Sequence, residues 1–251
     1  MSDQRFGMEL FWEQAQGILD RVVRTQSEQI RRAAEVMADC IERDGVVHTY
    51  GTGHSRAFAM ELANRAGGLV PVNRMDLLQL VPRAGWPAER VFNPDIERDP
   101  EAGPALLACH NIYPQDVFII ASNSGVNPAI VDVAARVKEH GHTLIAVTSM
   151  EHSTRMSSRA ASGKKLYELA DIVIDNCGPY GDALLDLPNG KGQACSISSL
   201  TGALIGQMLT AETIGILFDH GHEPPVLISA NVTGGLENNE ALRQKYAGRI
   251  D

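Results

Sequence analysis

Residues 46–68 read VVHTYGTGHSRAFAMELANRAGG, and this stretch decides the fold class. It opens with an apolar, β-branched run over residues 46–50, which is typical of a buried strand. Gly51 and Gly53 then interrupt the run, and residues 56–65 are mostly strong helix formers. The order of these features predicts a strand, a tight glycine turn and a helix.

The glycine turn is a candidate ligand site. Glycine lets the backbone approach a ligand closely, and the helix start presents free N–H groups and a positive dipole end to an anion. The stretch lacks the third glycine of the dinucleotide fingerprint, because Arg56 stands there, and it lacks the lysine of a P-loop. A plain strand-to-helix turn without a ligand is the alternative that this stretch alone leaves open.

Short apolar runs recur further along the chain, and helical patterns separate them. Strands that alternate with helices in this way imply an α/β fold with a parallel, doubly wound sheet. The further strands are predicted over residues 69–73, 116–121, 143–149 and 171–175, and the later helices over residues 128–138, 196–218 and 237–249.

Three stretches are predicted to hold little regular structure. Residues 74–104 suggest an insertion or lid, and a functional loop and a plain surface excursion fit this pattern equally well. Residues 152–163 are polar and suggest a loop with some helix. Residues 178–192 are rich in turn formers.

The N-terminal part of the chain has apolar residues at helical spacing, and Asp44 and Gly45 end the pattern. Within a single overall domain, we expect a helical arm over residues 1–44 and the main α/β part over residues 45–251. The apolar stripe is long for a helix outside a sheet, so we expect it to cover a neighbouring subunit. The candidate interface residues are Ile18, Val22, Ile30 and Met37.

The composition narrows the classes of function. A net charge of −9 disfavours binding to nucleic acid or to an anionic membrane. The sequence shows no run of 18 apolar residues and starts with a polar segment, so we expect neither a membrane span nor a signal peptide. The scattered residues Cys40, Cys109, Cys177 and Cys195 form no CxxC pair, which indicates reduced, buried thiols in a cytoplasmic protein.

A second predicted strand is followed, like the first, by a turn with glycine and hydroxyl residues. The sequence SNSGVN over residues 122–127 follows one strand, and Thr148 and Ser149 end another. Ligands of open α/β sheets bind beyond the carboxyl ends of the strands. Hydroxyls, amides and helix-start N–H groups at that edge would form a phosphate cradle without a lysine. Helix capping explains each motif alone, but the two together favour a phosphate or sugar-phosphate site.

With these motifs the sequence resembles the sugar isomerase (SIS) family. ASNSGVNPAIVDVA is similar to that family's Ser-x-Ser-Gly-x-Thr/Asn phosphate loop, and YGTGHS is similar to its Gly-x-Gly-x-Ser turn. The similarity runs from about residue 45 to residue 215 and extends to a bacterial single-domain subgroup that includes candidate phosphoheptose isomerases. The resemblance implies a five-stranded parallel sheet flanked by helices, phosphosugar binding and oligomers with shared active sites. By motif match, the phosphate ligands would be Ser55, Ser122, Asn123, Ser124 and Asn127, with Thr52, Gly53 and His54 beside them.

Aldose–ketose isomerisation moves a proton between C1 and C2 through an enediol, and it needs a base near both carbons. Glu61 is the first candidate, because related isomerases and N-acetylmuramic acid 6-phosphate etherases place a glutamate in this helix. Glu212, on the late helix, is the second candidate. A solvated helix carboxylate is the alternative for both. Phosphoheptose isomerases carry a catalytic histidine on the late helix, whereas here the nearest candidates, His220 and His222, follow it.

The sequence therefore predicts a cytoplasmic phosphosugar-binding protein, an aldose–ketose isomerase that uses no cofactor and no metal. An amino-sugar-phosphate lyase or etherase, or a non-catalytic sugar-phosphate sensor, is the alternative. We expect a small sugar phosphate as ligand, no nucleic-acid or membrane partner, and a homodimer or homotetramer with shared active sites.

Overall fold

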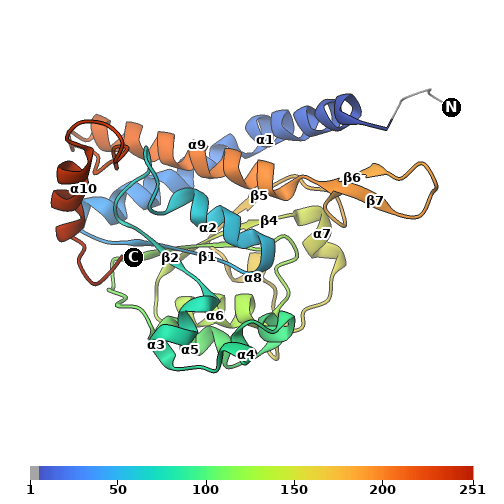
Figure 1. Cartoon of the computed structure of the whole chain (residues 1–251), viewed down its shortest axis with the longest axis horizontal. Helices are drawn as coiled ribbons and strands as arrows, with labels where there is room; N and C mark the ends of the chain where they lie inside the picture. Colours follow the sequence, from blue (N-terminus) through green and yellow to red (C-terminus); the bar gives the residue numbers. More distant parts are fainter. Residues whose placement is uncertain (1–5, 251) are drawn as a thin grey trace.

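The computed structural model describes residues 6–250, and a five-stranded parallel sheet forms its centre (Figure 1). The strand order is β2-β1-β3-β4-β5. This architecture confirms the predicted fold class. The strands are β1 (Val47–Gly51), β2 (Val72–Met75), β3 (Val117–Ala121), β4 (Thr143–Thr148) and β5 (Ile172–Asp175).

The register of the strands brings the two predicted loops to one edge of the sheet. Val47 pairs with Val72 on one side and with Val117 on the other. Gly51, the last residue of β1, therefore lies beside Ala121, the last residue of β3. Because the strands are parallel, the segments that follow them leave the sheet side by side.

Two layers of helices cover the sheet (Figure 1). The upper layer in this view packs on a core that includes Ile119 and Ile145, and the lower layer on a core that includes Phe118 and Ile120. The upper layer consists of α1 (Met8–Glu42), α2 (Arg56–Leu62) and α9 (Ser198–Asp219). The lower layer consists of α3 (Leu80–Ala84), α4 (Ala88–Val91), α5 (Ala102–Ala108) and α6 (Pro128–Glu139). The other helices are η1 (Gly53–Ser55), η2 (Leu77–Gln79), η3 (Pro94–Arg98), α7 (Met150–Arg155), α8 (Leu166–Leu169) and α10 (Gly235–Gln244).

The apolar stripe of α1 packs inside its own chain. α9 lies along α1, and the stripe joins the core on the upper face of the sheet. The four residues expected at a subunit interface are all buried here, so that expectation is wrong. They are Ile18, Val22, Ile30 and Met37. The outward face of α1 still exposes Met8 and Trp12, whose exposed fractions are 78% and 60%. The division into an arm over residues 1–44 and a main part over residues 45–251 stays a prediction.

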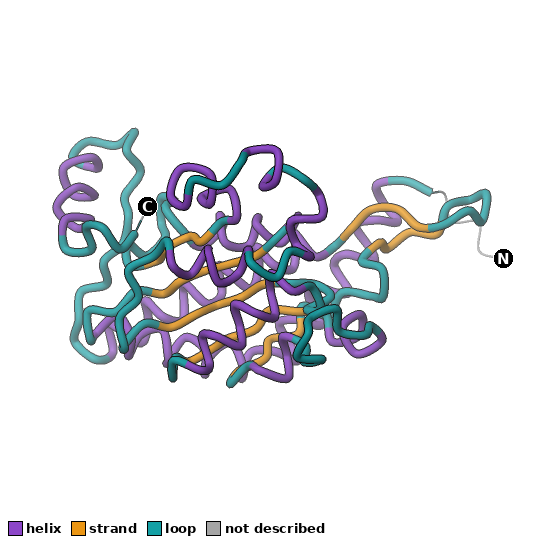
Figure 2. Tube along the Cα trace, turned by 90° about the horizontal axis from the view of Figure 1, so that it is seen from below, coloured by secondary structure: helices purple, strands orange, loops and turns teal. Residues whose placement is uncertain are grey.

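The turn-rich stretch near residue 180 folds into a hairpin that the sequence analysis missed. β6 (Ala183–Asp186) and β7 (Gln193–Ser196) pair antiparallel. The hairpin projects from the body beside the N-terminal half of α1 (Figures 1 and 2). Cys195 on β7 is exposed, which contradicts the expectation that all four thiols are buried.

The predicted insertion after β2 is also more regular than expected. It holds η2, α3, α4, η3 and α5, joined by short turns. Asp76 starts this segment with a capping box. The Asp76 carboxylate accepts from the backbone N–H of Leu78, and the side-chain oxygen of Gln79 accepts from the backbone N–H of Asp76. We call residues 76–101 the strap.

Among residues 6–250, α9 is the helix that is long and apolar enough to cross a membrane by length and composition. In this fold α9 packs against α1 and α2 on the sheet. The core helix of a globular protein has the same composition, so this feature by itself is weak evidence for a membrane span.

Candidate functional site

The glycine turn after β1 has a geometry that only glycine permits. A Cβ at Gly51 would lie 2.5 Å from the carbonyl oxygen of Ser55, so a side chain there would collide with the backbone of η1. Gly53 has a φ of +53°, in the left-handed region that favours glycine. Ser55 N donates to Thr52 O at 3.0 Å, which closes the turn before α2 begins. The predicted strand, turn and helix are confirmed.

The loop after β3 is a second rigid turn. Gly125 N donates to the Ser122 hydroxyl at 3.1 Å, and Gly125 has a φ of +63°. Thr148 on the neighbouring strand donates its hydroxyl to Ser122 O at 2.7 Å. The hydroxyls of Ser122 and Thr148 are therefore hydrogen-bonded to the backbone of this loop. The Ser124 hydroxyl, by contrast, has no hydrogen-bond partner within residues 6–250 and is free to bind a ligand.

A cleft joins the two loops to the start of α9. Asn123 in the cleft accepts through Oδ1 from Asn176 Nδ2 at 2.9 Å, and Ser198 donates its hydroxyl to Asp182 at 2.7 Å. Asn176 and the serines of α9 carry no local motif that points to the cleft, because only the fold brings their distant segments to this edge. The polar lining consists of His54, Ser55, Ser122, Asn123, Asn176, Ser198 and Ser199.

A second cavity of about 220 Å³ lies on the other side of the glycine turn, between the turn and the strap. Thr52, Gly53 and Glu97 are among its lining residues. Asn127, which the sequence analysis assigned to phosphate binding, donates through Nδ2 to Glu97 at 2.8 Å and accepts from Arg159 at 2.8 Å. Asn127 stands at the N-cap position of α6, but its side chain does not cap the helix.

Residues 10–149 match the family model described as SIS domain, which spans more than half of the chain. The chain belongs to the SIS domain family. It is 37% identical over 242 residues to a UPF0309 protein of Listeria monocytogenes, covering 96% of this chain and 97% of the relative. A UPF0309 protein of Geobacillus kaustophilus is 36% identical over 232 residues, with 92% and 91% covered.

Two solved structures share the SIS fold at low sequence identity. One is a candidate phosphosugar isomerase involved in capsule formation from Bacteroides fragilis, with a TM-score of 0.55, 16% identity and coverage of 82% of this chain and 88% of that chain. The other is a phosphoheptose isomerase from Francisella tularensis, with a TM-score of 0.51, 17% identity and coverage of 82% and 95%. Both comparisons support the fold of the chain.

Glu61, the first catalytic candidate of this SIS domain, lies one turn beyond the cleft on α2. Gln207 on α9 donates to its carboxylate at 2.6 Å, and Arg65 forms an ion pair with it. The Glu61 side chain is 24% exposed. Gly206 faces Glu61, and Gly202 faces Phe58, which lines the cleft, so α9 approaches α2 closely from the cleft to Glu61.

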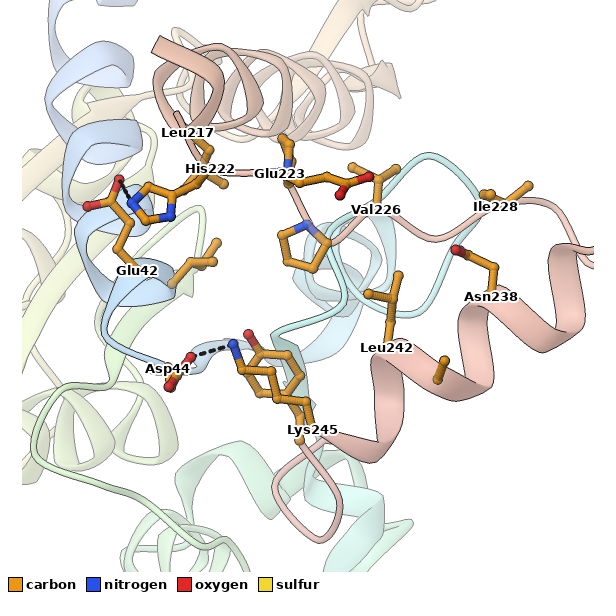
Figure 3. A pocket seen from close by; sticks show the side chains of 15 residues that line it. Glu42, Asp44, Leu217, His222, Glu223, Val226, Ile228, Asn238, Leu242 and Lys245 are labelled. Atoms are coloured by element: carbon orange, nitrogen blue, oxygen red, sulfur yellow. Dashed lines mark ion pairs between the residues drawn. The ribbon is translucent and has the colours of Figure 1, made fainter. Parts of the chain in front are cut away.

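The structure does not bring Glu212 or His222 to the cleft of their own chain. Glu212 lies in the second half of α9 and pairs with Arg31 at 3.1 Å. His222 follows the end of α9, in a separate cavity of about 580 Å³ where it faces Glu42, while Lys245 there pairs with Asp44 (Figure 3). α9 has 22 residues, so its two ends lie roughly 30 Å apart.

A buried polar cluster occupies the amino edge of the sheet, opposite the cleft. Asp116 accepts from His48 at 3.2 Å, from Arg249 at 2.5 Å and from the backbone N–H groups of Val46 and Tyr113. Burial raises the pKa of Asp116, but these hydrogen bonds outweigh it and lower the pKa from 3.8 to about 2. Burial lowers the pKa of His48, although Asp116 acts in the opposite direction. The cluster therefore holds an ionised carboxylate beside a neutral imidazole.

Proposed function

We propose that the chain binds a sugar phosphate in the cleft and interconverts its aldose and ketose forms. The observation that carries this proposal is the meeting of two rigid glycine turns at one sheet edge. Between them they offer the hydroxyls of Ser55 and Ser124, which have no protein partner among residues 6–250. Hydroxyls and helix-start N–H groups are the donors that hold a phosphate without a lysine.

The proposal gives different roles to the residues of the two turns. Ser55 and Ser124 would donate to the phosphate, while Gly53 and Thr52 let the backbone approach it. Ser122 would fix the loop by its bond to Gly125. Asn123 and His54 line the cleft or its rim, where they would contact the sugar.

In the same proposal, Glu61 carries the proton between C1 and C2. A sugar that extends from the cleft along the exposed side of α2 would run toward Glu61, which lies one turn beyond the cleft on that helix. Gln207 and Arg65 hold the carboxylate in one orientation, which a general base requires. Glu212 is the second candidate for the base, and His222 could act only in a site shared between chains.

The names of the structural relatives support sugar-phosphate chemistry in general. The Francisella protein is a phosphoheptose isomerase, and the Bacteroides protein is a candidate phosphosugar isomerase. Residues 198–219, which form α9, contain no histidine, so the heptose reaction is not the one we propose. An etherase or lyase acting on an amino-sugar phosphate would use the same Glu61, and a sensor would use only the phosphate loops.

We further propose a cytoplasmic homodimer or homotetramer with shared active sites. The exposed Met8 and Trp12 on α1 are the apolar residues that a second copy would cover, since the inward stripe of α1 is already buried. Light scattering on the intact protein tests this part. A monodisperse, active monomer at micromolar concentration would contradict it.

The catalytic proposal is tested in two steps. A thermal-shift panel of sugar phosphates first identifies the ligand, because binding raises the melting temperature by mass action. Solvent deuterium exchange at C2 of that ligand is then compared for the wild type, Glu61→Gln and Glu35→Gln. Glu35 is an exposed carboxylate on α1 and serves as the matched control. We expect exchange to collapse by roughly 10²–10⁴-fold in Glu61→Gln alone, with binding retained.

The other outcomes separate the alternatives. Exchange at the wild-type rate in Glu61→Gln would move the base to another residue, with Glu212 tested next. Binding without any exchange in the wild type would support the sensor. Cleavage of an amino-sugar ether would support the etherase, and no sugar-phosphate binding at all would refute the proposed function.

A further inference from the structure

The carboxylate of Glu97 touches both of the turns that form the proposed phosphate site. Its Oε2 accepts from Asn127 Nδ2 at 2.8 Å, at the end of the loop after β3. Its Oε1 lies 2.8 Å from the position that a Cβ would take at Gly53, so only glycine lets the carboxylate rest on the turn after β1. One internal anion therefore bridges the two loops.

This carboxylate lies against Asn127 and Gly53, which belong to the same two turns as Ser55 and Ser124, the proposed phosphate donors. Within residues 6–250, Glu97 forms no ion pair, and Arg159 reaches it only through Asn127 Oδ1. Asn127 directly precedes α6, a helix of 12 residues whose N-terminal end favours a negative charge. The Asn127 amide is thus already occupied at both of its ends.

The strap holds Glu97 in this place through contacts of its own. Glu97 belongs to η3, where Asn93 accepts from the backbone N–H of Asp95 at 2.9 Å. Ile96 beside it packs against the lower core. The carboxylate is therefore presented by a packed segment, and a ligand that displaces it must turn the side chain away or move the strap.

We propose that Glu97 is an internal competitor that sets the affinity and the ligand specificity of the anion site. This inference rests on the proposed function. A phosphate held by Ser55 and Ser124 would lie on the same two turns as this carboxylate, where the two anions repel each other, so the phosphate binds by displacing the carboxylate. A dianionic phosphate does this more readily than the single charge of a sugar acid, so the site discriminates against sugar acids.

Calorimetry with inorganic phosphate tests this inference on the full chain. Glu97→Gln keeps the size of the side chain and an oxygen that accepts from Asn127, but it removes the charge. We expect phosphate to bind about ten-fold more tightly, the effect of removing one moderate repulsion between charges. Asp95→Asn is the matched control, because it removes the same charge from η3 at a side chain that is 73% exposed. Its phosphate affinity should stay within about two-fold of the wild type, because exposed charges are well screened.

Fluorescence gives a second readout of the same event. Trp86 lies on the strap and stacks with Arg90 at 3.7 Å, whereas Trp12 lies on α1. In a Trp12→Phe background, phosphate should change the emission of Trp86 when the strap responds to displacement of Glu97. The change should be smaller in Glu97→Gln, whose neutral side chain shares the site with phosphate. An equal change in both proteins would argue against the inference.

The outcomes for this inference and for the proposed function differ. Equal or weaker phosphate affinity in Glu97→Gln would overturn the inference and leave the proposed function standing. Absence of phosphate and sugar-phosphate binding in both proteins would overturn both. If Glu97→Gln does not fold, Glu97→Asp replaces it. Asp withdraws the carboxylate by one methylene and should still raise the affinity, and unchanged affinity in that variant would overturn the inference.

Discussion

Polar side chains lie at both edges of the sheet, but those at one edge bind each other and those at the other edge are left open to a ligand. At the amino edge, His48 and Asp116 are buried, and the largely buried Arg249 and His48 both bind the Asp116 carboxylate. At the carboxyl edge, Ser55 and Ser124 are partly accessible, and their hydroxyls have no protein partner among residues 6–250. A buried polar group needs a hydrogen-bond partner within the protein, whereas an accessible polar group can bind water until a ligand replaces it. The comparison separates structural polar residues from candidate ligands.

Removing Asp116 from the amino edge should cause the largest loss of stability. Asp116→Ala leaves His48, Arg249 and two backbone N–H groups without their acceptor. We expect a loss of about 3–5 kcal/mol in the free energy of unfolding, as for other buried charge partners that lose their counterpart. Urea unfolding at pH 7 measures this change, and Asp95→Ala, an exposed carboxylate, is the control. A loss below about 1 kcal/mol would mean that the Asp116 cluster does not stabilise the fold.

Breaking the carboxyl edge should affect ligand affinity and leave stability unchanged. Ser124→Ala removes a hydroxyl that has no partner within residues 6–250, so the melting temperature without ligand should barely move. Sugar-phosphate affinity should fall by about 1.5–3 kcal/mol, the size of a hydrogen bond to a charged group. Calorimetry measures the affinity, with Ser162→Ala in an exposed loop as the control. Unchanged affinity in Ser124→Ala would mean that the Ser124 hydroxyl does not contact the phosphate.

Acid should weaken the amino edge in two steps. His48 has a lowered pKa, so its contribution to stability is full above about pH 6.5 and falls as the pH drops below that value. The pKa of Asp116 is lowered to about 2 from 3.8, so its contribution is full above about pH 4 and is lost toward pH 2. The Asp116 step should remove about 2 kcal/mol. Urea unfolding at several pH values checks this, and a second step that persists in Asp116→Asn would assign it to other carboxylates.

Much of the fold could be predicted from the sequence because its signals are local. The strand that ends at Gly51, the turn through Gly53 and the loop at residues 122–127 each follow from a few neighbouring residues. The hairpin near residue 190 was missed, since β6 and β7 are short, partly exposed strands without a clear alternation of apolar residues.

The site could be predicted only in part. Ser55 and Ser124 could be predicted as phosphate ligands because each belongs to a local turn motif, and the parallel sheet brings those turns to one edge. Glu97 was missed because its position on the strap becomes meaningful only where η3 meets Gly53 and Asn127. His222 looked close to the late helix in sequence, but α9 carries it to the other edge.

The sequence by itself determined the order of the five parallel strands and the long helices and the two glycine turns, because backbone preferences and apolar periodicity act over a few residues. The tertiary structure decided which polar groups became partners. It paired His48 with Asp116 and Asn127 with Glu97, and it buried the α1 stripe against α9. These contacts join residues far apart in the chain, and their energies depend on burial and distance, which exist only once the sheet and its two helix layers have assembled.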